Sequence, residues 1–218
     1  MTRTLGGLAI GAVALFGATH AEAAILLTGP YPQAASVNLA GTVAGANLSA
    51  TANFTVTSVT ATQIAISLML NNTTPAAQPG TNRIVSFGFD ILPDANRTIS
   101  GVTESDSDWG ASINTQISGG NVVDICLRVG PTCSGGGGGG IGEGGNDTIV
   151  FAIDGTFGSG LSLDNFVARF QSVGPGANGS GTIFENGGVV VPEPMSLALF
   201  GAALAGLGLL GRRAARAG

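Results

Sequence analysis

The sequence predicts an all-β protein: one antiparallel domain, of the β-sandwich or jelly-roll kind, between two terminal targeting segments. Three observations support this prediction. Short runs between residues 50 and 185 alternate apolar with polar side chains, which is the period of a half-buried strand. Gly, Pro and Asn cluster between these runs, as they do in turns. No run in the middle of the chain sustains a helical period.

The alternating runs define the expected strands. Six apolar faces fall within residues 50–56, 64–70, 85–91, 123–129, 149–153 and 166–170, and residues 181–185 are expected to add an edge strand. The first two runs are separated by Thr60-Ala61-Thr62, so we expect them to pair as a hairpin. Together the faces place about 20 apolar side chains inside, which is a normal core for one domain at residues 24–188.

Residues 1–23 have the order of a secretory signal peptide. A basic start at Arg3 precedes an apolar run from Leu5 to Gly17, and Ala21-Glu22-Ala23 is a small-x-small cleavage site. We expect export by the Sec machinery and cleavage by signal peptidase between Ala23 and Ala24. The alternative is a retained anchor, but the apolar run is shorter than the roughly 20 residues of a spanning helix.

The C-terminal segment, residues 189–218, has three parts. Pro192-Glu193-Pro194 comes first, an uncharged stretch over 195–211 follows, and a basic end over 212–218 closes the chain. As a helix, the uncharged stretch would span roughly 25 Å, which is the short end for a bilayer. Arg212, Arg213 and Arg216 would hold that end in the cytoplasm, so the rest of the mature chain is expected outside.

This tail resembles the PEP-CTERM sorting signal of exopolysaccharide-making bacteria. The resemblance rests on Pro192, Glu193 and Pro194, the apolar helix, and Arg212 with Arg213, and covers about 27 of 218 residues. It implies an inner-membrane intermediate that exosortase, a membrane protease-transferase, cuts near Pro-Glu-Pro and deploys at the cell surface or in the extracellular matrix. Such a tail also carries the label ice-binding protein C-terminal domain. The alternative is an ordinary single-pass anchor.

The middle of the chain is similar to the cistern family of these proteins. The similar features are Cys126 and Cys133 around a Gly-rich stretch, residues 166–175, and Gly179-Ser180-Gly181. This resemblance implies an extracellular protein of unknown molecular activity and supplies no catalytic residues.

The composition between residues 24 and 191 excludes several kinds of chemistry. This part has no Lys and no His, and its four Arg stand against eleven acids, a formal charge of −7. Without His, neither a Ser-His-Asp nor a Cys-His set can form. So few basic residues do not suit nucleic acid. We expect no enzyme; a hydrolase with two carboxylates is conceivable, but nothing in the sequence pairs two acids.

The two cysteines, Cys126 and Cys133, are expected to form a disulfide, because an even pair in an exported chain is typical of one. Gly130-Pro131 can turn the chain between them. Cys126 has the parity of Asp124 and Arg128, which is the face away from the core. The Gly-rich loop that follows, residues 134–145, has almost no side chains to bury, so we expect it to be flexible.

Two segments resemble calcium loops. Glu104, Asp106 and Asp108 place carboxylates at every second residue, and Ca²⁺ prefers several oxygen ligands. Trp109 beside them could stack on a sugar ring; the alternatives are a solvated acidic turn and a core tryptophan. Residues 144–149 resemble one unit of a calcium-binding β-roll, which needs consecutive repeats, so a simple turn is the alternative. No other cofactor is expected.

Two hypotheses follow. The first is a surface or biofilm-matrix protein without catalytic activity, associated with exopolysaccharide. The second is a Ca²⁺-assisted glycan-binding module at the cell surface, with Glu104, Asp106, Asp108 and Trp109 as its site.

Overall fold

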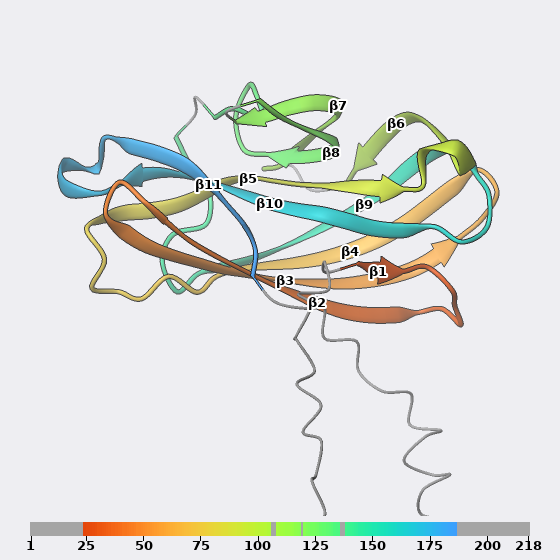
Figure 1. Cartoon of the computed structure of the whole chain (residues 1–218), viewed down its shortest axis with the longest axis horizontal. Coiled ribbons are helices and arrows are strands. Elements are labelled where there is room, and N and C mark those ends of the chain that lie inside the picture. The colour runs from red at the N-terminus through yellow and green to blue at the C-terminus, as the bar shows by residue number, and fades with distance from the viewer. Residues whose placement is uncertain (1–23, 106–107, 119, 136–137, 187–218) are drawn as a thin grey trace, which may run out of the picture.

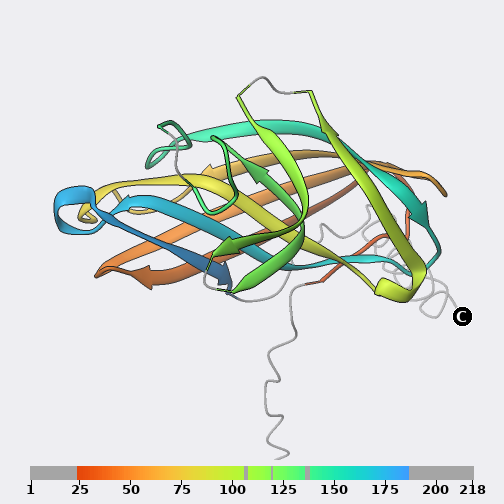
Figure 2. The same ribbon diagram turned by 90° about the horizontal axis from the view of Figure 1, so that it is seen from above.

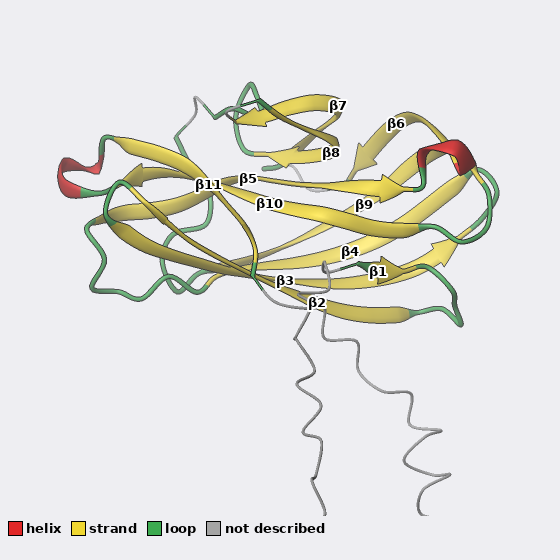
Figure 3. Ribbon diagram, viewed as in Figure 1, coloured by secondary structure: helices red, strands yellow, loops and turns green. Residues whose placement is uncertain are grey.

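The structure, a computed structural model, describes residues 24–105, 108–118, 120–135 and 138–186 (Figure 1). These residues form antiparallel strands and two short 3₁₀ turns, η1 (Asp94–Asn96) and η2 (Pro175–Ala177). The strands are β1 (Ile25–Leu26), β2 (Gln33–Val43), β3 (Ala46–Val59), β4 (Gln63–Asn72), β5 (Gly80–Leu92), β6 (Arg97–Glu104), β7 (Gly110–Ser118), β8 (Asn121–Arg128), β9 (Asn146–Phe157), β10 (Ser162–Val173) and β11 (Gly179–Glu185). The prediction of an all-β, antiparallel fold is confirmed (Figure 3).

Hydrogen bonds join the strands into one sheet in the order β6-β9-β4-β3-β2-β11-β10-β5-β8-β7, with β1 beside β10. The sheet curls until its first and last strands, β6 and β7, contact each other without a backbone ladder (Figure 2). Its two halves face each other across the core as sandwich layers do, but they are not separate sheets. The strand expected at residues 181–185 is present as β11, but its predicted place at an edge is wrong. It pairs with β10 and, through Phe184 and Glu185, with β2, so it links the two halves of the sheet.

The hairpin of β3 and β4 shows how the alternating pattern sets the register. Phe54 lies opposite Leu68 and Val56 opposite Ile66, and all four side chains are buried. In the turn, the Thr60 N–H donates to the Gln63 carbonyl at 2.8 Å, and the Thr60 hydroxyl accepts the Gln63 N–H at 2.9 Å. The predicted hairpin is confirmed. Its register is strongly specified, because a slip by one residue would expose every apolar side chain of the strand.

Aromatic rings fill the centre of the core. The Phe54 ring lies 5.4 Å from Phe166, 5.8 Å from Phe89 and 6.0 Å from Phe87, between ring centroids, in tilted or edge arrangements. Such pairs add roughly 0.5–1.5 kcal/mol beyond the burial of their area. Because these phenylalanines come from β3, β5 and β10, they hold the two facing halves together.

Two residues of the predicted faces lie elsewhere. Val85 is buried, but its neighbour Ile84 takes the core position, because the β5–β10 register shifts between Arg169 and Phe170. Val123 belongs to a second, smaller apolar cluster, which lies on the other face of the sheet. At Val85, simple alternation fails because a bulge changes the parity of the strand.

The two ends of the described chain lie along one edge of β10. β1 pairs there with Ser162 and Leu163, and β11 pairs further along with residues 167–173. Ile25 is fully buried, so the fold is tied down from its first strand. The predicted leader (1–23) and tail (189–218) lie outside the described residues. Among those residues, no helix has the length and hydropathy needed to cross a membrane.

Candidate functional site

A hollow of about 430 Å³ lies between the start of β7 and the start of β9. Its wall consists of Asp108 and Trp109, of Val129, and of residues 138–142 and 145–147. The two segments that resemble calcium loops therefore border the same hollow. Their sequence separation gave no indication of this proximity.

Trp109 is a core residue whose edge borders the hollow. Its side chain is 3% exposed, and its indole N–H donates to Asp147 Oδ2 at 2.9 Å. Asp147 Oδ1 accepts the Thr148 N–H at 2.8 Å. Stacking on a sugar requires an exposed ring face, which Trp109 does not offer, so the predicted ligand role of Trp109 is wrong. A tryptophan with its polar edge hydrogen-bonded is the usual buried form.

The acidic turn is described only in part. Glu104 is half-buried at the end of β6, opposite Phe151 of β9, and Asp108 is exposed at the rim of the hollow. Asp106 lies outside the described residues. Within the described ranges, no group of three acidic, His or Cys side chains is placed to hold a metal ion. Ca²⁺ binding at this turn therefore stays a prediction.

The Gly-rich loop is partly fixed, which differs from the prediction of a flexible segment. Ile141 is buried, and its backbone exchanges two hydrogen bonds of 3.0 Å with Ile84. The buried Asn72 side chain donates to the Ile141 carbonyl at 2.9 Å, and the Asn72 backbone bonds to Gly144 and Gly145. The glycine-rich composition predicted no buried side chain here, but Ile141 is buried and holds this part of the loop against β5.

The predicted disulfide between Cys126 and Cys133 is present, with the two Cα atoms 6.3 Å apart. Cys126 lies on the face away from the main core, as its parity predicted, opposite Gly88 of β5. The bond is nevertheless buried, because Ile117, Val123 and Val167 pack around it as a second apolar cluster. The disulfide therefore fastens the segment after β8 to the outer face of the sheet.

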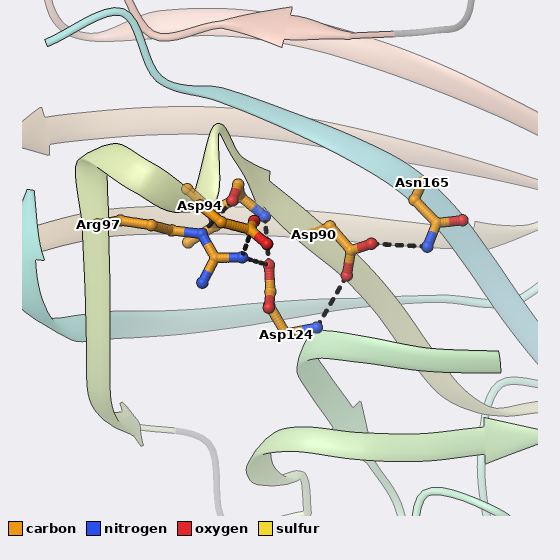
Figure 4. Close-up of polar contacts among 6 residues, drawn as sticks. Asp90, Asp94, Arg97, Asp124 and Asn165 are labelled. Atoms are coloured by element: carbon orange, nitrogen blue, oxygen red, sulfur yellow. Dashed lines mark hydrogen bonds and ion pairs between the residues drawn. The ribbon is translucent and has the colours of Figure 1, made fainter. Parts of the chain in front are cut away.

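A polar network on the same outer face was not predicted (Figure 4). Asp90 accepts the Asp124 backbone N–H at 2.9 Å and the Asn165 amide at 2.7 Å. Asp124 Oδ2 accepts the Ile91 N–H at 2.8 Å and also Arg97 Nη2. The network joins residues that are up to 75 positions apart, so no local motif could indicate it.

Burial governs the electrostatics of this network. The Arg97 and Asp124 side chains are only 10% and 13% exposed. Desolvation raises the pKa of Asp124, while the Ile91 N–H and the Arg97 charge oppose that rise. Arg97 begins β6, the first strand of the sheet order, and Asp124 lies in β8, beside the last strand, β7. Their ion pair therefore connects the two ends of the curled sheet. The carboxylate oxygens accept N–H groups here, which suits a structural role.

The sorting residues Pro192, Glu193, Pro194, Arg212 and Arg213 lie outside the described residues, as does Ala23 at the predicted cleavage site. No family model, curated protein or solved structure matches this chain.

Proposed function

We propose that this chain is an exported surface or extracellular-matrix protein without catalytic activity, which exosortase sorts through the C-terminal tail. The observation that carries the proposal is that the described strands begin just after the expected leader and end just before the expected tail. β1 begins at Ile25, directly after the expected cleavage site, and β11 ends at Glu185, shortly before Pro192. The described fold thus lies within the expected mature segment.

The position of the two ends suits a tethered intermediate. Because β1 and β11 lie along one edge of β10, a tail beyond Pro192 would hold the domain by that edge. The five residues between Asn186 and Pro192 reach at most about 18 Å when extended. Before processing, the domain would therefore stand close to the membrane and expose its remaining surface. The disulfide supports an oxidising compartment.

Fractionation of cells that carry tail variants tests the proposal. Removal of residues 192–218 is expected to move the protein from the envelope to the soluble fraction. The matched variant Glu193→Ala keeps the apolar helix and the arginines, so it is expected to stay in the membrane unprocessed. If both variants fractionate as the unaltered chain does, the tail does not sort the protein.

A second candidate function is Ca²⁺-assisted glycan binding, which the shared hollow favours. Asp108 and Asp147 border the hollow together with glycine backbone, and oxygen ligands of this kind suit Ca²⁺. Titration calorimetry with Ca²⁺ and the melting temperature test this. Asp108→Asn is expected to abolish the heat of binding, whereas Asp154→Asn, on the far part of β9, serves as the control. No heat and no change in melting temperature would remove the candidate.

A further inference from the structure

Three of the four arginines between residues 24 and 191 form no ion pair within the described ranges; both ion pairs there involve Arg97. Arg169 donates to the hydroxyls of Ser118 at 2.7 Å and Ser180 at 3.2 Å. Arg128 donates to the Ser112 hydroxyl at 3.2 Å and to the backbone carbonyl of Gly130, two residues along the chain. In a segment with a formal charge of −7, arginines that pair with no acid of the described residues need an explanation.

The three arginines share one face of neighbouring strands. Arg169 of β10 lies opposite Ser86 of β5, which lies opposite Arg128 of β8. Arg83 lies opposite Gln171, two residues from Arg169 on the same side of β10. Paired residues point to the same face, and adjacent strands are about 4.8 Å apart, so the Cα atoms of Arg128 and Arg169 lie roughly 10 Å apart. This basic strip points away from the phenylalanine core.

The outer face of β10, β5 and β8 is sorted into rows. The acidic row contains Asp90 and Asp124 with their Arg97. The middle row is apolar and contains Val167, Gly88 and Cys126 under the disulfide. The third row is the basic strip. The apolar row separates Asp90 and Asp124 from the strip, so neither of these acids pairs with Arg83, Arg128 or Arg169.

Arg169 is held in a partly dehydrated position. Its Nε is buried without a hydrogen-bond partner, as is the Ser86 hydroxyl beside it, and burial lowers the pKa of Arg169. A Cβ at Gly135 would lie 1.9 Å from Gln171 Nε2 and 3.3 Å from Arg169 Nε, so the chain after Cys133 rests against the strip. The disulfide thereby holds a wall beside Arg169. A cation in such surroundings gains from an anionic partner.

We propose that the basic strip, formed by Arg83, Arg128 and Arg169 with Gln171 and Ser180, binds the carboxylate groups of an acidic polysaccharide. Arg pairs with a carboxylate through two parallel hydrogen bonds. The hydroxyl and amide groups between the arginines match sugar hydroxyls. A nucleic acid fits less well, because the strip has no aromatic ring for base stacking. The proposal goes beyond sorting and needs neither the tail nor Ca²⁺.

Binding of the full chain, purified in detergent, to polygalacturonate tests the strip. EDTA in the buffer separates the result from any Ca²⁺ site, and neutral dextran is the control polymer. Arg169→Gln and Arg83→Gln are each expected to weaken binding about tenfold. Arg169→Lys keeps the charge without the planar fork and is expected to lie between. Asp154→Asn makes the net charge more positive elsewhere and is expected to change nothing.

Arg83 is exposed, so Arg83→Gln should fold even if Arg169→Gln does not. The result that overturns the proposal is wild-type affinity in Arg83→Gln and in a folded Arg169 variant. Equal binding to dextran would overturn it as well. Equal binding to single-stranded DNA would identify an unselective polyanion surface and contradict recognition of a sugar carboxylate.

Discussion

The flank of the sheet and its seam are held together by different means. In the flank, β2 and β3 pair without interruption from Gln33↔Val56 to Val43↔Ala46. At the seam, β6 and β7 contact each other without a ladder, and side chains make the connections: Arg97 with Asp124, and Trp109 with Asp147. A curled sheet thus needs specific side-chain bonds where the backbone ladder ends.

The largest effect is expected in the core that both regions share. Phe89→Ala should lower the free energy of unfolding by about 4 kcal/mol, since Phe89 is fully buried among aromatic rings. Urea denaturation measures this change. Met69→Ala, at a side chain 40% exposed on β4, should cost under about 0.5 kcal/mol. Similar losses in both variants would mean that the aromatic cluster does not dominate the stability.

The ion pair at the seam should come next. Asp124→Ala leaves Arg97 and the Ile91 N–H without this partner, and we expect a loss of about 3 kcal/mol. Asp154→Ala, on β9 and outside this ion pair, removes an exposed hydrogen bond to Gln63 and should cost below about 1 kcal/mol. Equal stabilities of the two variants in urea would contradict the stabilising role of the ion pair at the seam.

The disulfide lies on the outer face of the sheet, within the second apolar cluster and apart from the phenylalanine core. Replacement of both Cys126 and Cys133 by Ala should lower the free energy of unfolding by about 2–3 kcal/mol, because closing a short loop restricts the unfolded chain. Thermal melting of the oxidised chain against the double variant measures it. An unchanged melting temperature would show that the second apolar cluster holds this loop alone.

The second bond at the seam should have a smaller effect. Asp147→Ala removes the acceptor of the Trp109 N–H and should cost about 1–2 kcal/mol. Because Trp109 is the only tryptophan, its fluorescence reports on this site directly and should shift to the red. Asp147→Asn keeps an acceptor oxygen and should leave the spectrum near its original position. An identical shift in both variants would contradict the assigned bond.

The smallest effect is the pH dependence from Asp124. Its pKa is raised in the folded state, so its contribution favours folding at low pH and is lost as the pH rises through that pKa. Asp124→Asn should remove this contribution, so the stability of the unaltered chain relative to that of Asp124→Asn should increase as the pH falls. Urea titrations at several acid pH values compare the two chains. A relative stability that decreases as the pH falls would show that the sign is wrong.

Much of the fold could be predicted from the sequence, because the apolar faces of β3, β4 and β9 alternate without interruption. Strands β6 and β7 were missed since their side chains are mostly polar and a bulge between Ile99 and Gly101 breaks the parity. The short β1 has too few residues to show a period.

The candidate site divides in the same way. The disulfide was predictable because it depends on spacing and parity within one short segment. The contact of Trp109 with Asp147 and the network of Asp90, Asp124 and Arg97 were not, because they depend on how the sheet curls. The basic strip likewise requires the register of β10, β5 and β8, which no single stretch of sequence contains.

The intact mass of protein recovered from the native envelope and medium tests whether the chain is exported, cut at both ends and cross-linked, as we propose. We expect a chain that starts near Ala24, ends near Pro192–Pro194 and lacks two hydrogens for the disulfide. A mass that retains the sequence through Gly218 would identify a permanent membrane protein and contradict sorting by exosortase.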